Sequence, residues 1–232
     1  FTSTNPSSTF ACSLDSAAFT ACTSPRTSTK LKVGAHNFKV QATAGGLTDP
    51  SPASFSWTID TVAPNTTITS APAALTNIPV ATLTFTSTEP GGGFQCSLDS
   101  GPFTPCPSPF VSSPLTDGKH NFQVKAVDAA GNVDKSAAKA KSWTLDTKPP
   151  VTTITGKPTN PTTSTTATFK FTSDEGSTFM CMLGKAASGF TACKTGQKYS
   201  GLAKGPHTFQ VQATDAARNV QLVPAVYNWT QN

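Results

Sequence analysis

The chain carries little charge and has no long apolar stretch. Charged residues are 12% of its 232 residues, and no hydrophobic run approaches the roughly 20 residues that a membrane-spanning helix needs. Its net charge of +5 comes from scattered Lys and Arg that do not alternate with aromatic residues. A protein that binds nucleic acid through its phosphates needs a basic stripe. We therefore expect neither a nucleic-acid partner nor a membrane span.

Motifs of catalysis are also missing. The sequence has no G-x-S-x-G elbow, no C-x-x-C and no carboxylate pair in a defined setting. The three histidines, His36, His120 and His207, occupy the same place in three similar segments. A catalytic histidine would need a partner that is special to one copy, so this repetition favours a structural role. We expect a protein that is not an enzyme and that uses no cofactor.

Internal repetition is the strongest signal that is present. FACSLDSAAFTAC at 10–22 recurs as FQCSLDSGPFTPC at 94–106, and a looser copy follows further along the chain. Trp57, Trp143 and Trp229 are separated by a constant 86 residues. A period of this length is a whole small domain, not one turn of a solenoid. The predicted domains are repeat 1 (1–61, partial), repeat 2 (62–147) and repeat 3 (148–232).

Within each repeat the hydrophobic pattern has a period of two. In the segment 119–127, His120, Phe122 and Val124 share one face and polar residues share the other. Nineteen Pro and sixteen Gly interrupt the chain often, which argues against long helices. The pattern predicts an all-β fold of tandem immunoglobulin-like antiparallel sandwiches. In repeat 2 we expect strands at 66–70, 80–87, 93–99, 102–107, 109–113, 119–128 and 138–146.

The six cysteines fall into one pair per repeat. Spacings of 10, 10 and 12 residues bracket a turn, and a hairpin brings such positions within disulfide reach. A zinc site would need four clustered ligands, whereas one repeat offers two Cys and one His. Disulfides form outside the cytoplasm, so we expect an extracellular, cell-surface or secreted protein. The predicted disulfides are Cys12 with Cys22, Cys96 with Cys106, and Cys181 with Cys193.

The motifs F-x-C-S-L-D-x-x-x-F-x-x-C, G-x-H-x-F-x-V-x-A-x-D-x-A-G-N and W-T-x-D-T-x-x-P-x-T-x-I follow one another along the chain. Together they resemble the tandem bacterial Ig-like, or fibronectin-III-like, repeats of large cell-surface and secreted proteins. The resemblance implies a sandwich fold and a role as a stalk, adhesin or filament-forming module. An alternative is a carbohydrate- or protein-binding accessory module of a larger secreted protein, for which Tyr199 and Tyr227, found only in repeat 3, are a faint hint.

The segment DAAGNVD places oxygen-bearing side chains at spacings that calcium ligands use. Asp128, Asn132 and Asp134 are therefore a weak calcium candidate. Repeat 3 has Gln221 in place of Asp134, and repeat 1 lacks the aligned Asp and Asn altogether. The favoured interpretation is a turn capped by Asp and Asn, with no metal.

Repeat 1 begins late, because FTST at its start aligns with 85–88 of repeat 2. Its first strand and most of its second are then missing, which leaves apolar side chains uncovered. One explanation is that the chain is a window on a longer array; the other is a strand donated by another subunit. We expect self-association or contact with neighbouring repeats, and possible binding to a surface glycan or protein receptor. The possible strand-acceptor groove consists of Phe1, Phe10, Leu14, Phe38, Val40 and Trp57.

Overall fold

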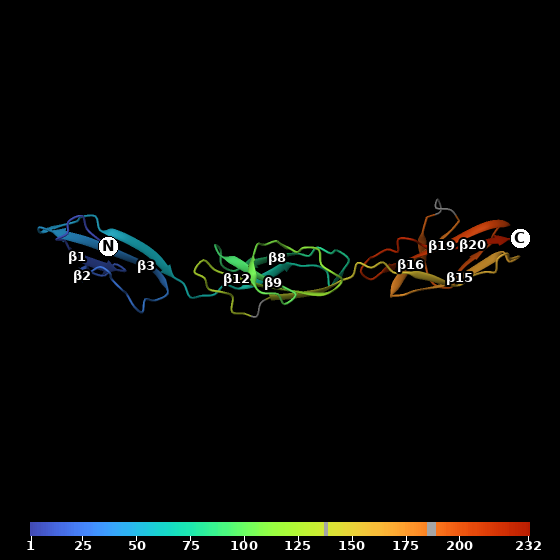
Figure 1. The fold of residues 1–232 in the computed structure, drawn as a ribbon, viewed down its shortest axis with the longest axis horizontal. Coiled ribbons are helices and arrows are strands. Elements are labelled where there is room, and N and C mark those ends of the chain that lie inside the picture. The colour runs from blue at the N-terminus through green and yellow to red at the C-terminus, as the bar shows by residue number, and fades with distance from the viewer. Residues whose placement is uncertain (137–138, 185–188) are drawn as a thin grey trace. The chain divides into compact units, whose positions relative to one another are not determined.

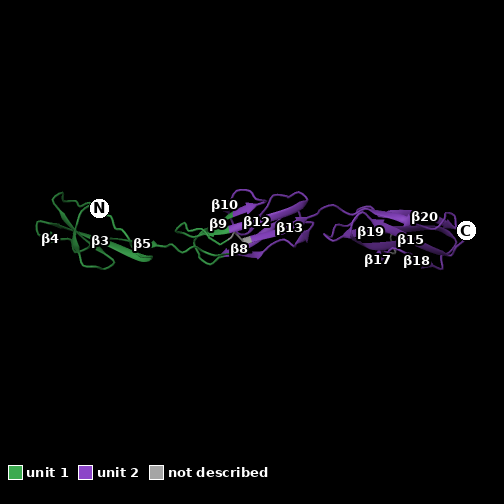
Figure 2. Cartoon of the chain, turned by 90° about the horizontal axis from the view of Figure 1, so that it is seen from below, with its two compact units in different colours: residues 1–66, 87–95, 125–138 green, residues 67–86, 96–124, 139–232 purple. Residues whose placement is uncertain are grey.

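The computed structural model describes residues 1–136, 139–184 and 189–232, and every regular element in them is a β-strand (Figure 1). The chain divides into two compact units (Figure 2). The first comprises Phe1–Thr66, Ser87–Gln95 and Lys125–Ala138, and the second comprises Thr67–Thr86, Cys96–Val124 and Lys139–Asn232. The predicted domain boundaries at 61 and 147 remain a prediction, and we keep the repeat names for these sequence segments.

Repeat 1 forms one antiparallel sheet. Strand β3 (Gly34–Ala44) pairs with β1 (Thr9–Leu14) on one side, and β1 continues to β2 (Thr20–Cys22). Both β4 (Leu47–Thr48) and β5 (Ala53–Ile59) also pair with β3. The register sets His36 opposite Trp57 and Phe38 opposite Phe55.

Repeat 2 forms two sheets. The first has the order β10-β9-β12-β13-β7, and the second has the order β11-β8-β6. The seven strands predicted from the sequence are all present, and the predicted start of the last at 138 lies outside the described residues. Their bounds are β6 (Thr66–Ser70), β7 (Leu75–Thr76), β8 (Thr82–Ser87), β9 (Gly93–Leu98), β10 (Thr104–Cys106), β11 (Phe110–Val111), β12 (Gly118–Val127) and β13 (Lys139–Leu145).

Strand β7 is an addition that the sequence did not predict. It pairs in parallel with the end of β13, through Thr144 opposite Leu75 and Leu145 opposite Thr76. The amide of Thr144 donates to the carbonyl of Ala74 at 2.8 Å. A two-residue strand has no detectable period of its own, so only its partner defines it.

Repeat 3 also forms two sheets, with the orders β14-β15-β18 and β17-β16-β19-β20. A register shift between Ile154 and Gly156 marks a bulge in the pairing of β14 with β15. The bounds are β14 (Thr152–Gly156), β15 (Thr166–Ser173), β16 (Ser177–Leu183), β17 (Thr191–Cys193), β18 (Gln197–Ser200), β19 (Gly205–Asp215) and β20 (Ala225–Gln231).

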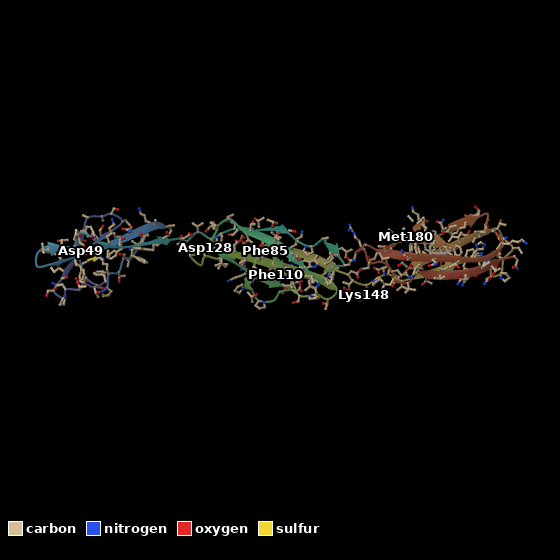
Figure 3. All side chains as sticks on the ribbon, turned by 90° about the horizontal axis from the view of Figure 1, so that it is seen from above. Asp49, Phe85, Phe110, Asp128, Lys148 and Met180 are labelled. Atoms are coloured by element: carbon tan, nitrogen blue, oxygen red, sulfur yellow. A yellow bond between two sulfur atoms is a disulfide. The ribbon has the colours of Figure 1, made fainter. Side chains whose placement is uncertain are left out.

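The cores follow the period of two. In repeat 3, Phe169 and Phe209 are stacked with their ring centroids 3.9 Å apart, and Trp229 packs on Phe169 at 5.3 Å. In repeat 2, Phe85 and Phe110, which Figure 3 labels, both pack on the ring of Phe122. Each such side chain contributes roughly 1.5–3 kcal/mol through burial. The alternating strands therefore supply the stability of these two repeats.

Candidate functional site

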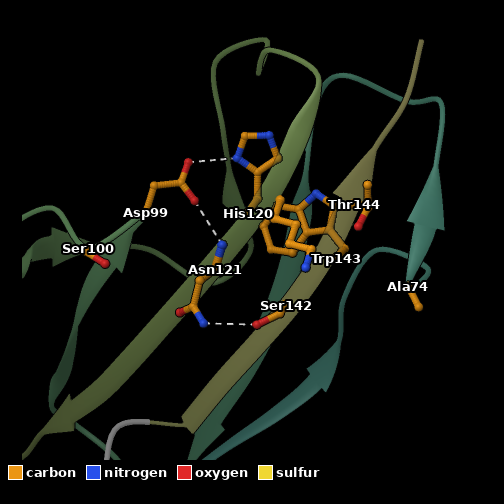
Figure 4. A pocket seen from close by; sticks show the side chains of 9 residues that line it. Ala74, Asp99, Ser100, His120, Asn121, Ser142, Trp143 and Thr144 are labelled. Carbon is orange, nitrogen blue, oxygen red and sulfur yellow. Dashed lines mark hydrogen bonds and ion pairs between the residues drawn. The ribbon is translucent and has the colours of Figure 1, made fainter. Parts of the chain in front are cut away.

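The same cluster of Asp, His and Trp closes one end of repeats 1 and 2. In repeat 2, Asp99 lies in the turn after β9, where it and Ser100 have positive φ values of 51° and 63°. This turn aims the Asp99 carboxylate back at the start of β12 (Figure 4). His120 donates from Nδ1 to Asp99 Oδ2 at 2.8 Å, and the Asn121 amide donates to Oδ1 at 2.9 Å.

The second nitrogen of His120 is occupied as well. Nε2 donates to the carbonyl of Thr116 at 2.8 Å, and the ring packs on Trp143 with centroids 5.7 Å apart. Repeat 1 repeats this arrangement, with His36 bonded to Asp15 at 2.8 Å. With acceptors at both nitrogens, neither imidazole offers the free lone pair that a general base needs. The cluster therefore ties a turn to the start of a strand, and we call Asp99, His120 and Trp143, with their counterparts in repeat 1, the strut.

The pKa values of the two histidines follow from these bonds. The carbonyl of Lys32 and then the carboxylate of Asp15 raise the pKa of His36 above its ordinary value, and the same bond lowers the pKa of Asp15. Burial acts to lower the pKa of His120, but the Asp99 carboxylate and a backbone acceptor outweigh it, so the pKa is raised. Both histidines therefore favour the protonated, doubly donating form.

Repeat 3 departs from this pattern. Gly184, with φ of 93°, takes the place of Asp99, and the residues that follow it, 185–188, lie outside the described residues. His207 still donates from Nε2 to the Ala203 carbonyl at 2.8 Å and stacks on Trp229 at 5.1 Å. The carbonyl bond and the Trp contact are thus shared by all three repeats, whereas the carboxylate is not.

A shallow cavity of about 540 Å³ adjoins the cluster in repeat 2 (Figure 4). Polar side chains, among them Asn121 and Ser142, line it, and the two are hydrogen-bonded at 3.0 Å. Trp143 contributes to the lining but is only 3% exposed. A ring so covered cannot present a face for stacking on a sugar or a base. The cavity is a polar recess built by the strut.

A second repeated arrangement holds the segment that leaves the last strand of a repeat. Asn132 donates from Nδ2 to the carbonyl of Asp60 at 3.1 Å and to Asp128 Oδ2 at 2.8 Å. The backbone amide of Asn132 donates to Asp128 Oδ1 at 2.8 Å, and Gly131 forms the turn with a positive φ of 89°. We call Asp60, Asp128 and Asn132 the first linker clasp. All three belong to the first compact unit.

The second linker clasp is made in the same way by Asp146, Asp215 and Asn219, all within the second compact unit. Asn219 donates to the Asp146 carbonyl at 2.8 Å and to Asp215 Oδ2 at 2.7 Å. Here Arg218 takes the place of Gly131 and has a positive φ of 77°. A non-glycine residue rarely adopts this conformation, so the clasp is kept at a conformational cost.

The fold brings together only two of the three residues of the calcium candidate. Asp128 and Asn132 are bonded to each other, whereas Asp134 turns to Thr66, which donates to Asp134 Oδ2 from its amide at 2.9 Å and from Oγ1 at 2.7 Å. Asp134 Oδ1 accepts from Ser136. The trio therefore does not converge on one point, and the calcium candidate remains a prediction.

Asp128 instead lies beside two acids that the sequence analysis did not select. Asp60, Glu89 and Asp128 each have an oxygen within 4.8 Å of the others, and Asp146 at the end of repeat 2 forms the same kind of group with Glu175 and Asp215 of repeat 3. Oxygen donors of this kind suit calcium. The sequence did contain a signal for these two groups, because their acids recur at nearly the repeat spacing. The pairs are 60 and 146, 89 and 175, and 128 and 215.

The glutamates of these two groups have raised pKa values. Desolvation, and then the negative charges of Asp60 and Asp128, raise the pKa of Glu89. Desolvation and the neighbouring aspartates raise the pKa of Glu175 in the same direction. Each group therefore concentrates negative charge beside a linker clasp.

Each predicted cysteine pair forms a disulfide. The Cα atoms are 5.8 Å apart in Cys12–Cys22, Cys96–Cys106 and Cys181–Cys193. Each bridge joins neighbouring strands of one sheet, namely β1 with β2, β9 with β10, and β16 with β17. Each disulfide therefore closes a hairpin and does not cross between sheets.

The residues of the predicted groove in repeat 1 are less buried than their counterparts in repeat 2, and the groove itself remains a prediction. Phe38, Val40 and Trp57 are half-buried, whereas their counterparts Phe122 and Val124 in repeat 2 are fully buried. Phe10 and Leu14 are half-buried, and Phe1 packs on Phe10 and Phe38 with centroids 5.1 and 6.0 Å apart.

The two tyrosines of repeat 3 are used internally. Tyr199 packs edge-on to Phe169, and Tyr227 donates its hydroxyl to the carbonyl of Pro158 at 3.0 Å. Both are half-buried against the core of the repeat. Neither stands out as part of an exposed aromatic platform.

The chain is an all-β protein of the immunoglobulin-like and fibronectin-III-like sandwich type. In the described part of the chain, no helix is long and apolar enough to cross a membrane. No protein-family model and no curated protein sequence matches it.

Three solved structures align with this chain. The fibronectin(III)-like modules of Clostridium thermocellum CbhA align with 15% identity and a TM-score of 0.44, over 72% of this chain and 94% of theirs. The FN1–FN3 domains of chicken CNTN1 align with 11% identity and a TM-score of 0.40, over 97% and 88%. A 1.5-MDa bacterial ice-binding adhesin aligns with 13% identity and a TM-score of 0.41, over 97% and 85%.

Proposed function

We propose that this chain is an extracellular, non-catalytic structural or adhesive module, part of a stalk or a filament-forming subunit. The observation that carries the proposal is the linker clasp, which occurs twice. In each clasp an asparagine side chain donates to the backbone carbonyl of an aspartate just after a last strand, Asp60 or Asp146. A catalytic or ligand-binding site would need residues special to one copy, whereas this device is repeated.

The linkers are constrained at their other end as well. Pro64 and Pro150 are fully buried, and proline fixes its own φ near −65°. The next residue but one, Thr66, is held by Asp134, and its counterpart Thr152 is held by Gln221. Each linker is thus fixed at both ends, which suits a spacer that must keep its conformation under load.

The disulfides support an extracellular location, because such bonds persist in oxidising compartments. The partners of a spacer are neighbouring repeats and a surface ligand, either a glycan or a protein. The accessory-module alternative would need an exposed aromatic cluster, and the tyrosines that suggested it are half-buried in the core of repeat 3.

The test is to loosen one clasp. Replacing Asn132 with Ala removes the bonds to the Asp60 carbonyl and to the Asp128 carboxylate, a loss of about 2–4 kcal/mol. We expect the amides of residues 60–65 to exchange with solvent several-fold faster, and small-angle scattering to show a broader range of dimensions. Asn121→Ala is the control for the loss of an asparagine side chain away from the linker, where it removes one hydrogen bond, to Ser142.

If Asn132→Ala changed neither exchange nor scattering relative to Asn121→Ala, the clasp would not stiffen the linker and the spacer proposal would lose its basis. Electron microscopy of native material separates a filament from a tethered stalk, because a filament shows a regular axial repeat.

A further inference from the structure

Repeat 3 has an apolar surface that repeat 2 lacks. Leu222 and Val223, in the connection between β19 and β20, are 86% and 76% exposed. Val151, the residue before β14, is 57% exposed. Large apolar side chains that are exposed together mark interaction sites. We call Val151, Leu222 and Val223 the apolar tip.

Hydrogen bonds hold the residues of the apolar tip on one surface. Gln221 Oε1 accepts from the amide of Thr152 at 3.2 Å, and Gln221 Nε2 donates to the carbonyl of Val223 at 2.7 Å. The side chain of Gln221 therefore joins Thr152, which follows Val151, to Val223. The apolar tip is thus a single surface and not a set of separate exposed residues.

The corresponding surface of repeat 2 is polar. The two connections align through one isolated bridge in each repeat, Val127 with Val133 and Thr214 with Val220. By this alignment and the repeat spacing, the apolar tip corresponds in repeat 2 to Asn65, Lys135 and Ser136. A requirement of the fold would be met in both repeats. An apolar surface in one repeat alone therefore indicates a contact with a partner.

Acidic residues border the apolar tip. The amide of Val151 donates to Asp174 Oδ1 at 2.8 Å, and the amide of Asp174 donates to the carbonyl of Val151 at 3.2 Å. Glu175 is exposed and forms one acid group with Asp146 and Asp215. Complementary interfaces set a positive surface against a negative one. The partner should therefore combine apolar side chains with positive charge, which argues against the pairing of two apolar tips.

Repeat 1 carries a surface of the required kind. Val33 and Val62 are 57% and 60% exposed, and Lys32, next to Val33, is exposed as well. Gly34 pairs with Ile59, so the residues just before β3 and those after β5 lie at the same end of the sheet. We call Lys32, Val33 and Val62 the basic patch.

The exposure of the basic patch is a property of the fold at this place. Gly118 pairs with Leu145 as Gly34 pairs with Ile59, so Val33 and Val62 correspond to Asp117 and Lys148. Both of these residues are exposed in repeat 2, where two sheets are present. Asp117 Oδ1 there accepts from the amide and the hydroxyl of Thr147 at 2.9 and 2.8 Å. Repeat 1 has valines at this solvent-facing place instead of a polar contact.

We propose that the apolar tip of one copy of this chain binds the basic patch of a second copy. The valines and Leu222 pack together, and Lys32 faces Glu175. Because the two surfaces differ, each bound copy still offers one surface of each kind, so further copies add in a chain or a ring. This inference names the partner in the filament form of the proposed function and rests on that function.

The first test is sedimentation velocity of the chain over a range of concentrations, at low and at high salt. We expect oligomers larger than dimers that grow with concentration and weaken at high salt, because salt screens exposed charges. Leu222→Ser should weaken association about ten-fold or more, because an apolar contact is lost. Leu222 is 86% exposed, so its replacement leaves the core of repeat 3 intact.

The second test exchanges the charges. Lys32→Glu alone and Glu175→Lys alone each set like charges against each other and should weaken association about ten-fold or more. An equimolar mixture of these two variants should associate again, because each variant then meets the opposite charge on the other. Lys198→Glu is the matched control, since Lys198 is exposed and lies outside both surfaces.

Three results would overturn the proposal. The first is a chain that stays monomeric at about millimolar concentration, including one that binds lipid vesicles through Leu222, since a membrane would then be the partner. The second is closed dimers that Lys32→Glu leaves intact, and the third is a mixture that associates no better than either variant. The clasp test on Asn132 is independent, so a chain that passes it without assembling keeps the spacer role and loses this inference.

Discussion

The buried bond between Thr66 and Asp134 allows a quantitative test of how the repeats are held together. Thr66 and Asp134 are 1% and 3% exposed. Thr66 Oγ1 donates to Asp134 at 2.7 Å and accepts from the Ala126 amide at 2.8 Å. Thr66→Val keeps the side-chain shape but removes both bonds. A bond to a charged group and a buried amide left unpaired together cost about 3–5 kcal/mol, a large share of the stability of a small domain.

Repeat 3 contains the matched control. Thr152 Oγ1 makes a single bond, to the neutral Oε1 of Gln221 at 2.6 Å, and the Ala213 amide donates to Gln221 instead. Thr152→Val should therefore cost about 1 kcal/mol, since no charge is stranded and no amide is left alone. The two substitutions are chemically identical, so the difference reports the local network.

The assay is urea unfolding followed by the NMR signals of the indole groups of Trp143 and Trp229, one in each of these repeats. Equal losses for the two variants, or a loss below about 1 kcal/mol for Thr66→Val, would refute the reasoning. Burial acts to raise the pKa of Asp134, but donors from Ser136 and Thr66 outweigh it, so the pKa is lowered. The stabilisation is then present above the ordinary pKa and lost as the pH falls through the folded value, so the effect of Thr66→Val should shrink below about pH 4.

Three further outcomes follow from the same structure. Replacing Cys96 and Cys106 with Ala opens a loop with a sequence separation of 10 and should cost repeat 2 about 2.8 kcal/mol in urea unfolding; no loss would contradict the staple. Asp99→Asn should lower the pKa of His120, measured by NMR titration. In the native chain the stability that comes from this raised pKa is complete below about pH 6.5 and is lost as the pH rises through the pKa of the folded state. The variant should therefore show a weaker dependence of stability on pH. An unchanged titration of His120 would contradict the role given to the bond between Asp99 and His120. Arg218→Gly should raise the thermal stability of repeat 3, by about 1 kcal/mol, because glycine accepts the positive φ of 77°; a lower melting temperature would show that the Arg side chain matters more.

Local features were predictable because they depend on neighbours along the chain. The alternation in 119–127 predicts β12, since a strand with one buried face must alternate. Cysteines ten residues apart around a turn predict a hairpin disulfide, because the hairpin geometry itself brings them together. The turn at Gly131 was also predictable, since only a few residue types accept its conformation.

The linker clasps and the acid groups were not predicted from the sequence, because their residues come from distant segments. Asp60 and Asn132 are 72 residues apart in sequence, and nothing in either segment indicates that they meet. Strand β7 was missed for the same reason, since a parallel partner on β13 defines it.

The sequence by itself determined the repeat, the strands, the hairpin staples and the recurrent histidine, because periodicity, turn chemistry and spacing are all local. The tertiary structure decided what these elements hold, namely the carboxylate that pairs with each of two histidines and the asparagine that fixes each linker. Those depend on which strands lie together in a sheet, and a chain specifies that only when its distant segments pack against one another.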